Sequence, residues 1–339
     1  MSITERVDRW QRRFPRVGFP IATIYKFGDD QGNYLAALMT YYAFVSLLPM
    51  LLLASTGLSF LLVGHPDLQA TLLRSALAQF PVVGEQLRAP KALGGGTAGI
   101  IVGVVGAVYG ALGAAQALQY AGNTVWQVPR NNRPNPFAAR GKSILLVATS
   151  GLGLLVILIV STTVSNALDT GTIGTLLLFL LSVAMFSVIF VFAFRMAPNA
   201  DLSVRQVLGG AVFAALLFRL LQTFGSTYVA NVVRHASTTN AVFAVVLGML
   251  AYLYLSSVIV VLAMEVDVVR ARRLWPRALL TPFTDEVDLT HADMRTYRGQ
   301  AMAQRHKGFE EIQVHFHDRD RNPPDSQDSA DRASTAEDQ

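Results

Sequence analysis

Five long stretches without a charged side chain restrict the possible folds of this chain more than any other feature of its sequence. They cover residues 31–64, 92–129, 143–168, 170–194 and 235–264. An α-helix rises about 1.5 Å per residue, so roughly 20 residues cross the hydrocarbon core of a bilayer, which is about 30 Å thick. Each stretch is therefore long enough to form a transmembrane helix.

The composition favours membrane helices over the alternative, a large soluble protein with buried helices. Charged residues make up 15% of the chain, hydrophobic residues make up 52%, and the mean hydropathy is +0.39. Soluble globular domains carry about 25% charged residues. The chain also lacks cysteine, which excludes disulfides, thiolate nucleophiles and zinc–sulfur sites.

The pattern predicts an all-α, polytopic membrane helix bundle with six transmembrane helices. The expected spans are residues 35–63, 98–122, 143–166, 173–194, 206–229 and 238–264. They form a membrane domain over residues 31–275. Residues 1–30 are a basic amphipathic segment, cytoplasmic or interfacial, which either lies on an anionic membrane face or packs on the bundle. Residues 276–339 are expected to be a polar, largely disordered cytoplasmic tail.

Six spans place both termini on the same side, and the positive charges identify that side. Sixteen lysine and arginine residues flank the helices on the side of the termini, whereas four fall on the opposite side. Short loops rich in lysine and arginine stay in the cytoplasm. The sequence therefore predicts a multi-pass protein with cytoplasmic N and C termini.

Glycine spacing in helix 98–122 indicates how that helix packs. At steps of four and three along one face lie Gly99, Gly103, Gly106, Gly110 and Gly113. Helices approach each other closely at such a face, and this drives packing where lipid removes the hydrophobic force. The same face could instead line a substrate path, or join two copies of the chain in a homo-oligomer.

A proline interrupts the first helix. Pro49 in SLLPMLLL cannot donate a backbone hydrogen bond and is expected to kink helix 35–63 near Val45. In lipid the freed carbonyl of Val45 needs a partner, which Ser46 or a neighbouring helix could supply.

Four segments resemble the YihY/BrkB family of bacterial membrane proteins, and within it the YhjD branch. They are LAALMTYYAFVSLLP (35–49), YAGNTVWQVPRNNRP (120–134), APNADLSVRQVLGGAVFAALLF (197–218) and LYLSSVIVVLAMEV (253–266). The matching positions are Tyr41, Ser46, Pro49, Asn123, Trp126, Pro198, Gly210 and Glu265. The resemblance covers about residues 20–275 and implies a six-helix protein of the bacterial inner membrane. Members have been called ribonuclease BN, serum-resistance factors and candidate exporters of lipids or lipid-linked precursors.

The ribonuclease label finds no support in the residues. Metal-dependent RNA hydrolysis needs histidines and carboxylates clustered around the ions, and no histidine pair in the membrane part has that spacing. The segment HFHDRD (315–320) reads as a solvated tail. No catalytic residue, metal site or cofactor is therefore expected. Membrane topology already accounts for the basic residues near the N-terminus, so no nucleic-acid partner is expected.

Arg219, in the apolar stretch FAALLFRLLQTF (213–224), is the strongest candidate for a functional residue. Helix 206–229 places it about 20 Å from the helix start, close to the bilayer midplane. A central arginine that faces lipid costs roughly 2.5–3.5 kcal/mol, so such residues normally face the bundle interior and have a partner. No carboxylate is expected at its depth.

An anion could supply that partner, because the guanidinium fork suits a phosphate or carboxylate. The expected polar cavity for an anionic group is lined by Arg219, Gln222, Thr223, Ser226 and Ser46. Two alternatives remain open: a structural arginine bonded to carbonyls and Asn, Ser or Thr side chains, or one that extends to the membrane interface.

Three further residues lie near the cytoplasmic ends of their helices. Trp126 is expected in the interfacial belt of aromatic residues. Asn123 is expected to cap its helix or bond a neighbouring one. Glu265 is expected to form a structural pair, with a proton relay as the alternative, and its possible partners are Arg195, Arg205 and Arg270.

These features favour a transporter or flippase that exports an anionic lipid or a lipid-linked envelope precursor. Its expected partners are membrane lipids, including an anionic lipid substrate. The alternatives are a non-transporting membrane scaffold of envelope biogenesis and, disfavoured for lack of a catalytic constellation, a membrane-tethered ribonuclease.

Overall fold

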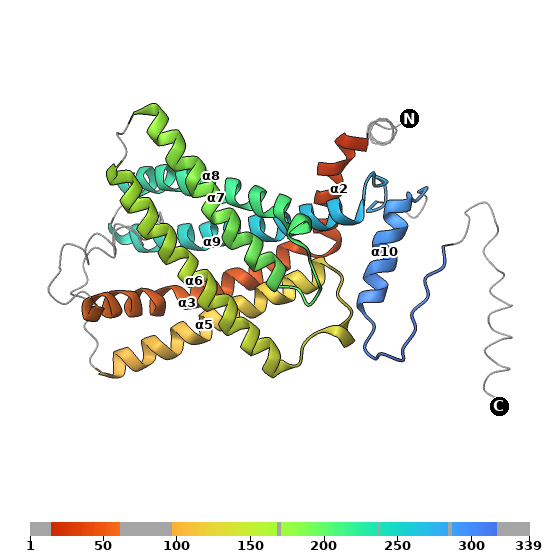
Figure 1. Ribbon diagram of the computed structural model, residues 1–339, viewed down its shortest axis with the longest axis horizontal. Helices are drawn as coiled ribbons and strands as arrows, with labels where there is room; N and C mark the ends of the chain where they lie inside the picture. Colours follow the sequence, from red (N-terminus) through yellow and green to blue (C-terminus); the bar gives the residue numbers. More distant parts are fainter. Residues whose placement is uncertain (1–14, 62–96, 168–170, 236–237, 284–286, 317–339) are drawn as a thin grey trace.

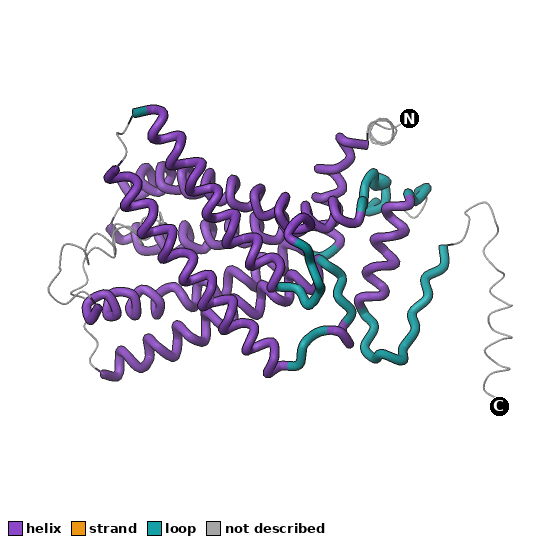
Figure 2. Tube along the Cα trace, in the orientation of Figure 1, coloured by secondary structure: helices purple, strands orange, loops and turns teal. Residues whose placement is uncertain are grey.

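The computed structural model describes residues 15–61, 97–167, 171–235, 238–283 and 287–316, and within these ranges it is helical without strands (Figures 1 and 2). This part of the chain confirms the all-α prediction. Its helices are α2 (Pro15–Asp29), α3 (Gly32–Leu61), α5 (Thr97–Val125), η3 (Arg130–Asn132, 3-10), α6 (Pro136–Ala167), α7 (Thr172–Met196), α8 (Val204–His235), α9 (Thr238–Arg272) and α10 (His291–Ala303).

Four stretches of the described helices are long and apolar enough to cross a membrane. They are Pro136–Ser161, Ile173–Met196, Val204–Gly225 and Val246–Arg272. Large apolar side chains stand exposed along α6 and α7, for example Leu152 and Leu176. A water-soluble surface does not carry such contiguous apolar area, so these helices turn their outer faces to lipid.

Most helices run further than the uncharged stretches predict. α6 begins about two turns before residue 143, and α9 continues about two turns beyond residue 264. The added turns carry charged side chains that find partners: the Nζ of Lys142 donates to the carbonyl of Pro198 over 2.9 Å. Absence of charge therefore marks the apolar part of each helix and not its ends.

α3 and α5 lie side by side along much of their length (Figure 1). α3 runs through Pro49 as one helix, and the ring of Pro49 lies against Gly106 of α5. The hydroxyl of Ser46 donates to the carbonyl of Ala43 over 2.8 Å, not to that of Val45.

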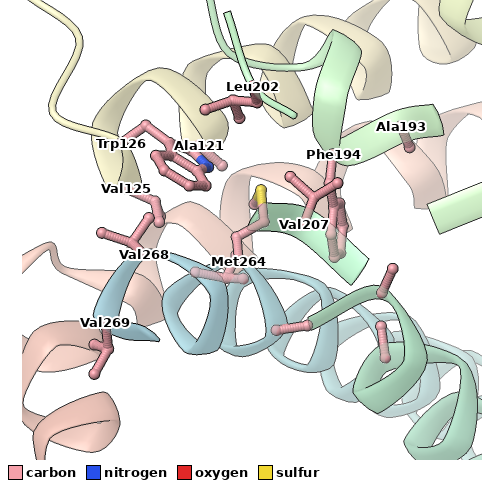
Figure 3. Packing of buried hydrophobic residues seen from close by; sticks show 14 of the residues in the cluster. Ala121, Val125, Trp126, Ala193, Phe194, Leu202, Val207, Met264, Val268 and Val269 are labelled. Atoms are coloured by element: carbon pink, nitrogen blue, oxygen red, sulfur yellow. The ribbon is translucent and has the colours of Figure 1, made fainter. Parts of the chain in front are cut away.

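The main core joins α2, α3, α5, α7, α8 and α9 at one end of the bundle. Figure 3 shows Val125 at the end of α5, and Trp126 directly after it, packed with Met264 and Val268 of α9. Trp126 is 4% exposed, so the expectation of an interfacial belt residue is wrong. The αL conformation of Gln127 (φ 52°) lies just beyond the end of α5 and redirects the chain that follows.

The expectation of a largely disordered segment from residue 276 onward needs correction. A capping box begins α10: the Thr290 hydroxyl accepts from the Asp293 N–H, and the Asp293 carboxylate accepts from the Thr290 N–H. Asp293 is also fully buried against Arg277, and these contacts hold the segment on the bundle. The expectations for residues 1–14, 64–96 and 317–339 lie outside the described residues.

Candidate functional site

Arg219 lies on α8 where the buried side of the helix meets its exposed side. It is 15 residues beyond Val204, or about 22 Å along the axis. Ala215 and Gln222 on one side of it are buried, whereas Leu216 and Leu220 on the other are exposed. The Arg219 side chain is half-buried at this boundary.

Most donors of the guanidinium have no hydrogen-bond partner among the described residues. Its Nη1 donates to the Oε1 of Gln222 over 3.1 Å, and its Nε is buried without a partner in the described part of the chain. The Gln222 side chain also bonds the buried Tyr252 of α9. Gln222 thereby connects Arg219 to the interior of the bundle.

The structure brings only part of the predicted cavity together. Thr223 is exposed, and its hydroxyl donates to the Arg219 carbonyl over 3.0 Å. Ser46 lies against Gly110 of α5 instead of facing α8. The side chain of Ser226 is outside the described residues. Arg219 and Gln222 are thus the two predicted residues whose side chains meet.

The glycine face of α5 lies against α3. A Cβ built on Gly106 would lie 2.9 Å from the Pro49 ring, one on Gly110 would lie 2.5 Å from the Ser46 Cα, and one on Gly113 would overlap Tyr42. No side chain fits at these positions, so this part of the face packs against a helix and leaves no room for a substrate. Nearer the start of α5, Gly103 is buried and Gly99 lies in the first turn.

Asn123 and Trp126 hold neighbouring segments at the end of α5. The Asn123 Oδ1 accepts from the backbone N–H of Asn199 over 2.7 Å, which fixes the connection between α7 and α8. The Trp126 carbonyl accepts from the Arg272 guanidinium over 2.6 Å. Both residues serve here in positioning helices.

Glu265 pairs with a residue other than the three predicted arginines. Its Oε2 lies 3.5 Å from the Nζ of Lys26 on α2, and Lys26 also pairs with Asp30 and donates to the Val125 carbonyl over 3.2 Å. Side chains of Lys26 and Glu265 are 0% exposed. A carboxylate on α9 is therefore neutralised by a lysine that precedes the first long apolar helix.

A second buried ion cluster adjoins the first. Arg277, 0% exposed, pairs with Asp293 and lies 2.9 Å from the carboxylate of Asp29. It links α2, α10 and the segment after α9. Because Asp29 and Asp30 are consecutive, the two clusters meet at the end of α2.

Sequence reasoning missed these clusters because the positive charges of Lys26 and Arg277 were assigned to membrane topology. Lys26 and Asp30 stand four residues apart, the spacing of a helical ion pair, and this was a readable signal. The partnership of Lys26 with Glu265 spans 239 residues, and no local pattern reveals it.

The ion pairs of Lys26 predict how stability depends on pH. Burial by itself lowers the pKa of Lys26, but the negative charges of Glu265 and Asp30 outweigh it, so the pKa is raised above its ordinary value. A raised pKa on a base stabilises the fold below the unfolded pKa, about 10.4, and this stabilisation is lost as pH rises through the folded value. We expect the melting temperature in detergent to fall above about pH 10.4, and more steeply than that of Lys26→Met; equal slopes would contradict this assignment.

No group of three His, Asp or Glu side chains in the described ranges has the arrangement of a metal site.

Comparison with known proteins identifies relatives over most of the chain. The family model described as virulence factor BrkB matches residues 23–282. The putative ribonuclease-like protein YfkH of Bacillus subtilis is 24% identical over 255 residues, 72% of this chain and 91% of the relative. A UPF0761 membrane protein of Alkalilimnicola ehrlichii is 28% identical over 260 residues, 74% of this chain and 57% of the relative.

A third relative, the inner membrane protein YhjD of Escherichia coli, is 22% identical over 278 residues, 75% of this chain and 80% of the relative. No solved structure matches this chain.

Proposed function

The chain belongs to the virulence factor BrkB family of membrane proteins, and we propose that it moves an anionic lipid or a lipid-linked envelope precursor across the bilayer. In this proposal α3 and α5 cross the bacterial inner membrane together with the four apolar stretches, which makes six spans with both termini in the cytoplasm. The excess of lysine and arginine on the side of the termini supports this orientation.

One observation carries the proposal: Arg219 lies deep in α8 without a carboxylate partner among the described residues. A guanidinium has five N–H donors, and among the described residues one side-chain bond, to Gln222, engages them. A phosphate or carboxylate group fits the remaining fork and neutralises the charge at once.

The position of Arg219 also suits a lipid better than a free anion. Leu216, Leu220 and Phe224 lie exposed on the bilayer side of the same helix. A lipid can keep its acyl chains against these residues while its headgroup reaches the guanidinium. The site then shelters the headgroup at the depth where crossing the hydrocarbon is most costly.

Replacement of Arg219 by alanine is expected to slow lipid movement at least about tenfold, because a charge-assisted hydrogen bond contributes about 1.5–3 kcal/mol. Transport would be measured in proteoliposomes as the accessibility of fluorescent phosphatidylglycerol to a membrane-impermeant quencher. Arg219→Lys should retain part of the rate because it keeps the charge without the fork.

Arg205→Ala is the matched control, since Arg205 begins the same helix and is exposed. Its rate should equal that of the original chain, and melting curves would establish that both variants fold. Lipid movement at an unchanged rate in Arg219→Ala would refute the role of Arg219. A folded, reconstituted original chain that moves no lipid would favour the scaffold alternative.

A further inference from the structure

A polar cavity of about 410 Å³ opens at the end of the bundle that carries the two ion clusters. Its walls come from the α2–α3 junction, the end of α5, η3 and α10. α8 does not contribute to the cavity, so it is separate from Arg219. Its volume falls in the range of small-molecule sites, about 300–1,000 Å³.

The carboxylates on one side of this cavity already pair with buried cations of the protein. Asp30 pairs with the buried Lys26 and also accepts from the Nε2 of Gln300 over 3.2 Å. Asp29 pairs with the buried Arg277. These carboxylates keep lone pairs for a hydrogen-bond donor without presenting an uncompensated charge.

The opposite side carries positive charge that no carboxylate of the described residues compensates. Arg133 donates from its Nε to the Val128 carbonyl over 3.2 Å and lies 5.8 Å from the ring centre of Tyr120. Arg130 is exposed and contacts His306 over 3.4 Å. Partial burial lowers the pKa of Arg133, and the positive charge of Arg130 lowers it further.

We propose that this cavity binds a phosphate ester. The guanidinium groups of Arg130 and Arg133 hold the phosphate, for which paired arginines provide charge and directed donors. Hydroxyl or amino groups on the rest of the molecule donate to Asp29 and Asp30. A soluble sugar or glycerol phosphate and the headgroup of a phospholipid share this chemistry.

The proposal goes beyond lipid export, because it concerns other residues and stands whether or not Arg219 takes part in transport. Two measurements distinguish the sources of the ligand. The first titrates sn-glycerol 3-phosphate into the detergent-solubilised full chain by calorimetry. The second measures binding of short-chain phosphatidylglycerol to the full chain in phosphatidylcholine nanodiscs.

Saturable binding in the first measurement assigns a soluble ligand, and binding in the second alone assigns a lipid headgroup. Arg130→Ala should weaken binding about tenfold. This variant suits the test because Arg130 is exposed and its removal leaves the core intact. Higher salt should also weaken binding.

Arg140→Ala is the control, since Arg140 is an exposed arginine near the start of α6 and does not line the cavity. Its affinity should be unchanged. Absence of saturable binding in both measurements overturns the proposal, and so does equal affinity of Arg130→Ala and the original chain.

Discussion

Substitution of Lys26 by methionine is expected to lower the free energy of unfolding by about 3–5 kcal/mol, the cost of breaking a buried ion pair by removing one partner. Lys26 is fully buried, and its Nζ serves Asp30, Glu265 and the Val125 carbonyl together. Without the ammonium, two carboxylates remain in the protein interior without their cation. Unfolding in mixed micelles, followed by circular dichroism, would measure the loss.

A compensating variant tests whether charge is the cause. Lys26→Met combined with Glu265→Gln and Asp30→Asn removes the orphaned charges and should recover a large part of the stability, because uncharged polar groups cost less to bury than ions. Lys142→Met serves as control: this lysine is half-buried and donates to a single carbonyl. Its loss should stay at about 1.5–3 kcal/mol or below, the value of one hydrogen bond from a charged group. Equal losses for the two lysines would contradict a special role for Lys26.

The second large effect is expected at Gly110. A methyl group there would lie 2.5 Å from the Cα of Ser46, which is backbone and cannot turn aside. Gly110→Ala must therefore separate α3 from α5, at a cost of about 1–3 kcal/mol, and Gly110→Val should cost more. Thermal unfolding in detergent would report the loss.

Gly151 provides a matched control for this substitution. It lies inside α6, and a Cβ added to it would meet nothing within 4 Å. Gly151→Ala should leave stability unchanged or raise it by up to about 1 kcal/mol, because alanine favours helix over glycine. If both substitutions had the same effect, close contact between α3 and α5 would not explain the glycines.

Composition and periodicity were sufficient for the long apolar helices, because such a helix needs only length and apolarity, but they did not predict α10. They also located Arg219, since one charge inside an apolar helix stands out in a single sequence. Helix ends were less predictable: α9 extends through Glu265 and Asp267, whose charges are met by Lys26 of α2 and the N–H of Gly210 in α8. Such partners are set by tertiary packing and leave no local trace.

For the candidate functional side chains, too, local sequence predicted some contacts, and tertiary packing set the others. Gln222 meets Arg219 because the two lie three residues apart on one helix. Ser46 does not, because the rotation of α3 turns it toward α5. Tryptophan is a residue type that favours the interfacial belt, but Trp126 packs in the core against residues of α8 and α9. α10 did leave a signal, since Thr290 and Asp293 form a capping box that is readable from sequence.

The docking of α10 has a practical consequence for topology mapping. Reporter fusions are often joined at the start of a polar tail, which the composition of this chain places near residue 276. A junction there removes Asp293, which is one of the two carboxylates that pair with Arg277. The buried ion cluster of Asp29, Arg277 and Asp293 then cannot form. Epitope tags and reporters belong after residue 316, where they leave intact the ion cluster that joins α10 to α2.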